Sequence, residues 1–495
     1  MKSRIFAALL VCLFLVGAVW AQQPGEQSYS DSPVLPGGVT GERIRSVIDT
    51  VNSGDPERVR RFINEDCTGP FKTNIPMDEH VQTLVGFFRQ TGGVDFSGIR
   101  SYVPERKGET IVIVKDRNLE SLWGVTLRFT AGPDALISGI GIGPARPSPA
   151  LKEAPLTEGQ AVEQMKALID KLIAKGVFSG ALLVAKGDKV LLTSAGGEAS
   201  KAFHVPNNVD TKFNLGSMNK MFTSTAIMRL VEKGKLSLDD PISKFLDESW
   251  LPKSVTEKIT IRHLLTHSSG LGSYFNETYD KSSRALFRKL DDSKPLIKDD
   301  RPAFEPGGRF QYSNTGMFLL GVVIEKVTGQ DYFDYIRKAI YEPAGMANSD
   351  SYEMDVPVEN LAIGYNPDPT SPAGWRNNLY THVIKGGPAG GGFSTVKDLH
   401  KFALALLAGK YVSPEILKMM WTDHLKANYG FGFTIDQGPA GKVVGHSGGF
   451  SGINSELDIY LDSGYIIAVM SNVDMGAGPL ARKLGQWLAR VGPAK

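Results

Sequence analysis

The sequence predicts an α+β protein built from two structured regions, and three observations support this prediction. Runs of alternating apolar and polar residues, typical of antiparallel strands, occur in three separate parts of the chain. Segments with apolar residues at helical spacing occupy most of 217–410. Stretches rich in proline at 22–40 and 146–156 separate these parts. With 495 residues the chain has room for two to three domains, since a domain takes about 100 to 200 residues.

The first residues have the three parts of a secretory signal peptide. Lys2 and Arg4 form a positive leader, a short apolar run follows, and Ala18-Val19-Trp20-Ala21 is a small-residue cleavage site. We therefore expect 1–21 to be removed on export to the periplasm or the medium. A membrane anchor is the alternative, but the apolar run is shorter than the roughly 20 residues that a spanning helix needs. We expect no transmembrane segment after cleavage.

Residues 41–145, after a linker at 22–40, predict a small α+β domain. Two helical segments are separated by the turn Ser53-Gly54-Asp55-Pro56, and another covers roughly His80 to Thr91. Alternating runs then predict an antiparallel meander of IRSYVPER, ETIVIVKD and LWGVTLRFTA. Helices followed by a meander resemble the cystatin-like cone folds of the nuclear-transport-factor-like class. No site is visible in this domain, and binding a ligand or partner is one role open to it.

Charge and cysteine content exclude several classes of function. Lys and Arg number 55 and Asp and Glu 53, without a basic stripe, so we expect no nucleic-acid partner. Cys12 lies in the signal peptide, so Cys67 has no disulfide partner and is expected to be a buried core residue. The sequence contains no H-E-x-x-H, no paired-cysteine spacing and no phosphate loop, so neither a metal nor another cofactor is predicted.

Residues 157–495, after a proline-rich linker at 146–156, predict the larger domain. An amphipathic helix and a hairpin with Gly187-Asp188 near its turn come first. After a helical middle, strands return as GFGFTID, KVVGHS, INSELDIYLD and GYIIAVMSN, before a last helix. Strands from both ends are expected to form one antiparallel sheet beside a helical lobe, with a binding cleft between them.

Two motifs compete as the site of a serine nucleophile. Gly445-His446-Ser447-Gly448-Gly449 matches G-x-S-x-G, a pattern that requires a helix after the serine. The residues after Ser447 alternate like a strand, so this context is missing. Ser217 and Lys220 form S-x-x-K at the start of a helix, one turn apart on the same face. A lysine of lowered pKa can take the proton of a neighbouring serine, so we prefer Ser217.

The S-x-x-K pattern is weak by itself. Ser394-Thr395-Val396-Lys397 is a second copy at a helix start, and Ser217 could instead be a helix cap with Lys220 in solvent. Tyr312-Ser313-Asn314 precedes an apolar helix and can present a phenol and a carboxamide to a cleft. Tyr274-Phe275-Asn276 has the same spacing but lies in a polar loop. We prefer Tyr312, because its flanks suit a rigid site.

Taken in order, these motifs resemble the serine β-lactamase and penicillin-binding-protein superfamily. S-x-x-K is followed about a hundred residues later by Y-S-N and then by H-S-G on a late strand. The similarity covers about 160–480 and extends to TKFNLGSMNKMFTSTAI, KITIRHLLTHSSGL and PGGRFQYSNTGMFLLGVVIEKVTG. The nearest branch contains class C β-lactamases, D-alanyl-D-alanine carboxypeptidases and related esterases. This resemblance implies a β-lactamase-like fold, with an antiparallel sheet flanked by helices and a helical lobe.

The resemblance also implies a role for each matched residue. The reacting groups would be Ser217 as the acyl-enzyme nucleophile, with Lys220 and Tyr312 as general base and acid. The substrate contacts would be Asn314, His446 and Ser447. The oxyanion hole would consist of the backbone N–H groups of Ser217 and Gly449. The other polar residues of these stretches are expected to be structural, namely Ser394, His263 and His267.

One departure from the family pattern bears on the substrate. Class C β-lactamases carry Lys-Thr-Gly where this chain has His446-Ser447-Gly448. A histidine of pKa near 6.5 is only partly charged at neutral pH, so we expect β-lactams to be poor substrates. Peptidases and esterases of this fold often have histidine there. The predicted function is an exported serine hydrolase for a small-molecule or peptide substrate, cleaving an ester or an amide. A binding or sensor protein with vestigial catalysis is the alternative.

Overall fold

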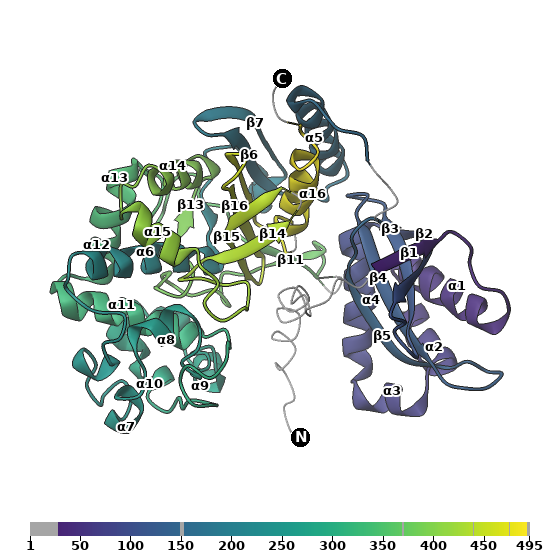
Figure 1. Cartoon of the computed structure of the whole chain (residues 1–495), viewed down its shortest axis with the longest axis horizontal. Helices are drawn as coiled ribbons and strands as arrows, with labels where there is room; N and C mark the ends of the chain where they lie inside the picture. Colours follow the sequence, from purple (N-terminus) through teal and green to yellow (C-terminus); the bar gives the residue numbers. More distant parts are fainter. Residues whose placement is uncertain (1–27, 149–152, 369–370, 439, 475, 493–495) are drawn as a thin grey trace. The chain divides into compact units, whose positions relative to one another are not determined.

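Two compact units, divided between Pro155 and Leu156, make up the chain (Figure 1). The computed structural model describes residues 28–148, 153–368, 371–438, 440–474 and 476–492. The predicted signal peptide, 1–21, lies outside the described residues. Each unit combines helices with an antiparallel sheet, so the predicted α+β class is confirmed.

The N-terminal unit packs helices against a sheet whose strands are ordered β1-β2-β3-β4-β5. Its strands are β1 (Ser28–Ser32), β2 (Val94–Val103), β3 (Thr110–Asp116), β4 (Leu122–Phe129) and β5 (Ile137–Pro144). Its helices are α1 (Gly38–Ser53), α2 (Pro56–Asp66), α3 (Gly69–Asn74) and α4 (Met77–Thr91). Cys67 is buried in this core, and burial raises the pKa of its thiol to about 12, as suits a structural cysteine.

The turn between the first two helices forms where the sequence predicts it. Gly54 ends α1 in the left-handed conformation, with φ of 59°. The Asp55 side chain accepts a hydrogen bond of 2.9 Å from the Glu57 N–H, and Pro56 is the first residue of α2. These residues satisfy the helix ends locally, which is why the sequence alone places this turn.

The structure corrects the linker predicted at 22–40. Ser28–Ser32 is the edge strand β1, paired with β2, and α1 already begins at Gly38. Asp31 accepts a hydrogen bond of 2.7 Å from the buried Arg100, whose guanidinium lies 4.1 Å from the centre of the Tyr29 ring. A serine-rich composition is typical of a linker, but backbone pairing and this charge pair hold the segment in the sheet.

The C-terminal unit is built around a six-stranded antiparallel sheet, counted within the described residues, in the order β14-β15-β16-β17-β6-β7. Its strands are β14 (Thr434–Gly438), β15 (Gly441–Phe450), β16 (Ile453–Tyr460), β17 (Tyr465–Ser471), β6 (Gly180–Lys186) and β7 (Lys189–Gly196). Because β6 pairs with β17, the sheet joins the two ends of the unit, as predicted.

Helices cover both faces of this sheet (Figure 1). The helices α5 (Glu158–Ala174) and α16 (Gly478–Leu488) pack on one face and α14 (Val396–Leu407) on the other. The helical lobe and its surroundings contain α6 (Asn219–Glu232), α7 (Lys253–Thr256), α8 (Ile261–Leu265), α9 (Glu277–Lys281), α10 (Lys294–Ile297), α11 (Asn314–Thr328), α12 (Tyr332–Ile336), α13 (Glu342–Ala344) and α15 (Pro414–Met420). Shorter helical turns are η1 (Gly216–Met218), η2 (Ile242–Lys244), η3 (Arg284–Leu286), η4 (Leu290–Ser293) and η5 (Arg337–Tyr341).

Short two-stranded sheets complete the described part of this unit. They pair β8 (Glu198–Ser200) with β9 (Val205–Pro206), β10 (Phe213–Asn214) with β13 (Phe393–Ser394), and β11 (Tyr365–Pro367) with β12 (Trp375–Asn377). The strand β10 leads directly into η1, so this pairing anchors the turn that carries Ser217.

The end of β15 lies beside this turn. The strand β14 pairs with β15 only as far as Gly445, so the residues from His446 onward lie beyond the end of β14. On the neighbouring strand β16, the Ser455 hydroxyl donates a hydrogen bond of 2.8 Å to the Leu215 carbonyl. The fold therefore brings the third motif of the sequence next to the first.

Candidate active site

Ser217 and Lys220 face each other at the start of α6. Ser217 lies in η1 and Lys220 in the first turn of α6, and Lys220 Nζ is 3.0 Å from Ser217 Oγ. The Ser217 residue keeps part of its surface exposed, whereas Lys220 is 0% exposed. The residue at the N-cap of α6 is Met218, without a side-chain cap bond. The alternative of a capping serine beside a solvated lysine therefore does not describe this pair.

The other partners of Lys220 are compatible with a neutral amine. Its Nζ lies 3.0 Å from Asn314 Oδ1 and also contacts the Ala389 carbonyl oxygen. Both oxygens only accept hydrogen bonds, so a neutral amine can donate both of its hydrogens to them and direct its lone pair at the Ser217 hydroxyl. Burial lowers the pKa of Lys220 well below its usual value, and no carboxylate among the described residues offsets this effect. This lysine can accept a proton from Ser217.

Tyr312 approaches the same hydroxyl from the start of α11. Burial raises the pKa of Tyr312 above its usual value, and a side-chain hydrogen bond with Ser217 partly offsets the rise. Lys220 Nζ lies 4.7 Å from the centre of the Tyr312 ring. The Ser313 hydroxyl accepts a hydrogen bond of 2.8 Å from the Gly316 N–H, which caps α11 and fixes the turn. Ser217, Lys220 and Tyr312 thus form one contiguous group.

A close backbone approach joins the Ser217 turn to β15. Gly216 has φ of 52°, and a Cβ added there would lie 2.8 Å from the Gly449 backbone nitrogen. Glycine is therefore required by both conformation and space. This approach brings the backbone next to Ser217 close to the N–H of Gly449.

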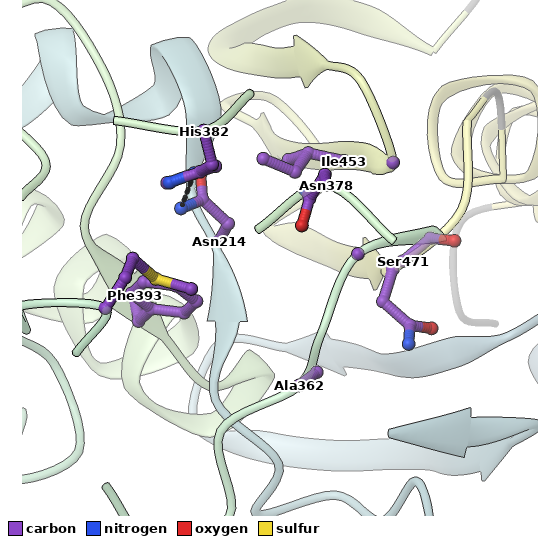
Figure 2. Close-up of a pocket in the computed structure, with 11 residues that line it drawn as sticks. Asn214, Ala362, Asn378, His382, Phe393, Ile453 and Ser471 are labelled. Carbon is purple, nitrogen blue, oxygen red and sulfur yellow. Dashed lines mark hydrogen bonds between the residues drawn. The ribbon is translucent and has the colours of Figure 1, made fainter. Parts of the chain in front are cut away.

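A small pocket, drawn in Figure 2, lies behind this turn. Asn214 lines it and accepts a hydrogen bond of 2.8 Å from the Gly216 N–H through its side-chain oxygen. The Asn214 side-chain amide also contacts His382 Nε2 at 2.8 Å (Figure 2). Ser217 is not among the residues that line the pocket. A residue that lines the pocket therefore holds the turn that carries Ser217, and the pocket does not contain the reacting groups.

His446 is more deeply buried than the sequence suggests. It is 3% exposed, its Nε2 lies 3.0 Å from the Tyr429 hydroxyl, and its Nδ1 lies 2.6 Å from the Ser447 carbonyl oxygen. Burial, together with the nearby Lys220, lowers the pKa of His446 to about 3. The expectation of a partly charged histidine at neutral pH is therefore wrong, because that expectation assumed a solvated ring.

Ser447 differs from its neighbour. It is exposed and pairs across the sheet with Glu456, while His446 pairs with the buried Leu457. Successive side chains of a strand point to opposite faces, so Ser447 points away from the face that His446 occupies. No hydrogen bond joins its hydroxyl to Ser217 or Lys220 in the part of the chain that the structure describes.

The competing sequence motifs do not form a reactive pair. The Ser394 hydroxyl contacts the Ser349 hydroxyl at 2.8 Å, and Lys397 pairs with Asp210 at 2.8 Å. Tyr274 is buried against Phe318, with ring centres 5.1 Å apart. His263 is half-buried and accepts a hydrogen bond of 3.2 Å from the Thr260 N–H.

Two residues next to the site were not assigned to it from the sequence. His267, expected to be structural, packs against Tyr312 with ring centres 4.4 Å apart, and its Nε2 lies 3.2 Å from the Tyr429 hydroxyl. Tyr429 was not identified at all. It lies 17 residues before His446 in an irregular segment, and no motif or spacing marks it. A third contact, the Ala389 carbonyl, is a backbone group and has no side-chain signature.

No group of three or more His, Cys, Asp or Glu side chains among the described residues is arranged to hold a metal ion. Within the same residues, the helices are all too short or too polar to cross a bilayer.

An antiparallel sheet covered by helices, a helical lobe and a serine–lysine pair between them define the class of serine hydrolases that includes β-lactamases and penicillin-binding proteins. Residues 165–489 match the Beta-lactamase family, and the chain belongs to this family. The superfamily resemblance and the fold predicted from it are thereby confirmed, and the chain is a serine hydrolase in this general sense.

Similar proteins support the same assignment. Penicillin-binding protein 4* of Bacillus subtilis (strain 168) is 31% identical over 329 residues, which cover 63% of this chain and 71% of that protein. A penicillin binding protein structure from Bacillus halodurans matches with a TM-score of 0.58 and 31% identity, over 64% of this chain and 97% of that one. A D-stereospecific amidohydrolase structure from Streptomyces sp. matches with a TM-score of 0.52 and 26% identity, over 66% of this chain and 97% of that one.

Proposed function

We propose that the chain is an exported hydrolase that cleaves an ester or a peptide amide through an acyl-enzyme on Ser217. The observation that carries the proposal is the 3.0 Å contact between Ser217 Oγ and a fully buried Lys220 whose other partners are carbonyl oxygens. In its neutral form such a lysine has a lone pair beside the Ser217 hydroxyl, which is what activation of a serine requires.

The proposed reaction has two steps. Ser217 Oγ attacks the substrate carbonyl carbon while Lys220 takes the hydroxyl proton, and the N–H groups of Ser217 and Gly449 stabilise the oxyanion. As the intermediate collapses, the bond to the leaving oxygen or nitrogen breaks, Tyr312 gives its hydroxyl proton to that atom, and the proton that Lys220 took from Ser217 passes to Tyr312. Water then attacks the acyl-enzyme ester while Lys220, again neutral, takes its proton. The ester bond to Ser217 breaks, Lys220 returns the proton to Ser217 Oγ, and the acid is released. Asn314 and His446 contact the substrate, whereas Ser447, whose side chain points to the opposite face of β15, can do so only through its backbone.

The substrate class is proposed from the third motif and from the relatives together. A neutral His446 lacks the fixed charge that a lysine offers to a carboxylate, so β-lactams are expected to be poor substrates. Similarity to a D-stereospecific amidohydrolase supports an amide that contains a D-amino acid. Esters remain the second class, since the same attack cleaves them with a better leaving group.

Export is proposed from the leader sequence. Lys2, Arg4 and the cleavage site that ends at Ala21 form the signal. The mature chain is then expected to begin at Gln22. Mass spectrometry of the N-terminal peptide from the secreted or periplasmic protein checks this, and an intact Met1 on the exported protein would contradict cleavage.

Covalent trapping tests the catalytic proposal. The mature protein is incubated with a fluorophosphonate probe and, separately, with a penicillin, and the labelled peptide is located by mass spectrometry. We expect phosphonate on Ser217, with little penicilloyl label. Label on Ser447 would overturn the assignment of the nucleophile. Absence of label from both probes would favour a binding or sensor protein with vestigial catalysis.

A further inference from the structure

Gly216 lies between two peptide groups whose directions determine where Ser217 points. A glycine restricts its own backbone less than any other residue, so groups outside it must fix these two peptide planes. The plane before Gly216 ends in its N–H, which donates a hydrogen bond of 2.8 Å to the Asn214 side-chain oxygen. The plane after it begins with the Gly216 carbonyl, which accepts a hydrogen bond of 3.0 Å from the Gly391 N–H. Because a peptide bond is planar, the direction of this carbonyl also sets the direction of the Ser217 N–H.

The two contacts of Gly216 differ in how firmly they are held. The contact with Gly391 joins two backbone groups. The contact with Asn214 depends on a side-chain amide, whose oxygen and nitrogen exchange places when the amide rotates by half a turn. With nitrogen in place of oxygen, two donors would face each other and the Gly216 N–H would lose its acceptor. The turn therefore requires a group that keeps the Asn214 oxygen on the Gly216 N–H.

His382 contacts the other end of the same amide (Figure 2). Asn214 Nδ2 lies 2.8 Å from His382 Nε2, and His382 Nδ1 lies 2.5 Å from the Val383 carbonyl oxygen. That carbonyl only accepts, so Nδ1 carries the hydrogen of a neutral ring and Nε2 accepts from the amide. A rotated amide would place its oxygen against the Nε2 lone pair. Among the described residues, the Asn214 side chain forms hydrogen bonds only with Gly216 and His382.

The ring of His382 has little freedom of its own. The residue is 4% exposed, and its backbone N–H donates a hydrogen bond of 2.9 Å to the Asn378 carbonyl. Phe393 and Phe450 pack against the ring, with ring centres 6.2 Å away in both cases. Burial lowers the pKa of His382 to about 4, so the ring is neutral at neutral pH. A fixed, neutral ring can therefore hold the amide in one orientation.

We propose that His382 is a positioning residue for the oxyanion hole. It holds the Asn214 amide on the Gly216 N–H, and the turn held in this way directs the Ser217 N–H at the developing negative charge. This inference rests on the proposed function and adds to it a residue that does not touch the reacting atoms. Loss of one oxyanion donor costs about 10²- to 10³-fold in kcat, so a donor that is misdirected part of the time should cost less, about tenfold.

A pair of substrates that differ in one atom tests the inference. An aryl ester and its thionoester share the same acyl group and leaving group, and sulfur replaces only the carbonyl oxygen. Sulfur is a weak acceptor, so the ratio of kcat/KM for the ester to kcat/KM for the thionoester reports how well the N–H groups meet the oxyanion. This ratio does not depend on the fraction of folded enzyme. In His382→Leu it should fall about tenfold, with a lower kcat for the ester and a nearly unchanged KM.

Two further variants separate positioning from packing. In His382→Gln the side-chain oxygen can accept from Asn214 in place of Nε2, so the ratio should stay within about threefold of the wild-type value. His400→Leu removes another buried histidine, whose Nε2 lies 2.8 Å from the Gly187 carbonyl oxygen, and should keep the wild-type ratio. A wild-type ratio in His382→Leu would overturn the inference. So would a ratio as low as that of His382→Leu in either of the other two variants.

A measurement on the wild type covers a His382→Leu variant that does not fold. Nitrogen-15 NMR, with His382→Gln to assign the signal among eight histidines, reports which ring nitrogen carries the hydrogen. We expect a neutral ring with its hydrogen on Nδ1. A hydrogen on Nε2 would overturn the inference, because two donors would then face each other. Phosphonate labelling separates the proposals: labelled Ser217 with an unchanged ratio contradicts only the role of His382, whereas unlabelled Ser217 contradicts the proposed function.

Discussion

The two S-x-x-K segments of the C-terminal unit share a motif and lie in adjoining parts of the fold, yet they have different chemistry. Lys220 is 0% exposed and lies 3.0 Å from Ser217. The side chain of Lys397 is 44% exposed and pairs with Asp210, while Ser394 contacts Ser349. The comparison shows that serine–lysine spacing alone does not create a base. A lysine becomes a base when burial removes it from water and no carboxylate pairs with it.

The local backbone explains why the two segments differ. Ser394 is the last residue of β13, and Thr395 caps α14 by accepting from the Asp398 N–H at 3.1 Å. Ser394 is therefore still in extended backbone when the helix begins. Ser217 instead lies within a helical turn that follows Gly216, whose positive φ turns the chain sharply. Only in that turn does the serine lie over the lysine one turn later.

The largest effect expected is on Ser217. Ser217→Ala should lower kcat/KM by roughly 10⁴-fold or more, because no acyl-enzyme can form. Ser394→Ala should keep activity within about threefold and cost about 1 kcal/mol for one buried hydrogen bond. Ester hydrolysis and thermal melting of both variants measure this, and equal activity losses would remove the distinction between the two segments.

The lysines should differ almost as strongly. Lys220→Met should lower kcat/KM by about 10²- to 10⁴-fold, since it removes the general base while preserving the length of the side chain. Lys397→Met removes a surface ion pair and should change stability by at most about 1 kcal/mol. Both variants are compared by single-turnover acylation. Normal acylation of the Lys220 variant would show that another group activates Ser217.

The two Y-x-N segments offer the next test. Tyr312→Phe should slow acylation by about 10²-fold or more, because the hydroxyl next to Ser217 is lost. Tyr274→Phe should leave acylation unchanged, since Tyr274 packs among aromatic rings and, among the described residues, no hydrogen bond joins its hydroxyl to Ser217 or Lys220. Stopped-flow measurement of acylation decides between these outcomes. A Tyr274 variant as slow as the Tyr312 variant would contradict the choice of motif.

The smallest expected effect concerns pH. Burial lowers the pKa of Lys220, so its neutral form persists to a lower pH than that of a solvated lysine. Below that pKa the base is protonated, and kcat/KM for a neutral ester should fall about tenfold per pH unit. His446, with a pKa of about 3, should add no second inflection near 6.5. Lys397→Met should give the same profile, whereas a second inflection, in addition to that of Lys220, would show that His446 titrates.

Local signals were strong enough to predict much of the fold. The Gly54, Asp55 and Pro56 turn satisfies helix ends within a few residues, and the strand pattern around β6 and β17 follows from alternation. The edge strand β1 could not be predicted from its composition, because its place in the sheet depends on pairing with β2 and on a charge pair with Arg100, 69 residues away.

The sequence by itself determined the order of the motifs, the family, and the residue types that could react, because these depend on neighbours a few positions apart. The tertiary structure alone decided which serine meets a buried lysine, that His446 is buried, and that Tyr429 and His267 lie beside the site. Burial and hydrogen bonding set these properties. The contacts behind them join Lys220 to Ala389 and Tyr429 to His446. These residues lie in separate segments that only the folded chain brings together.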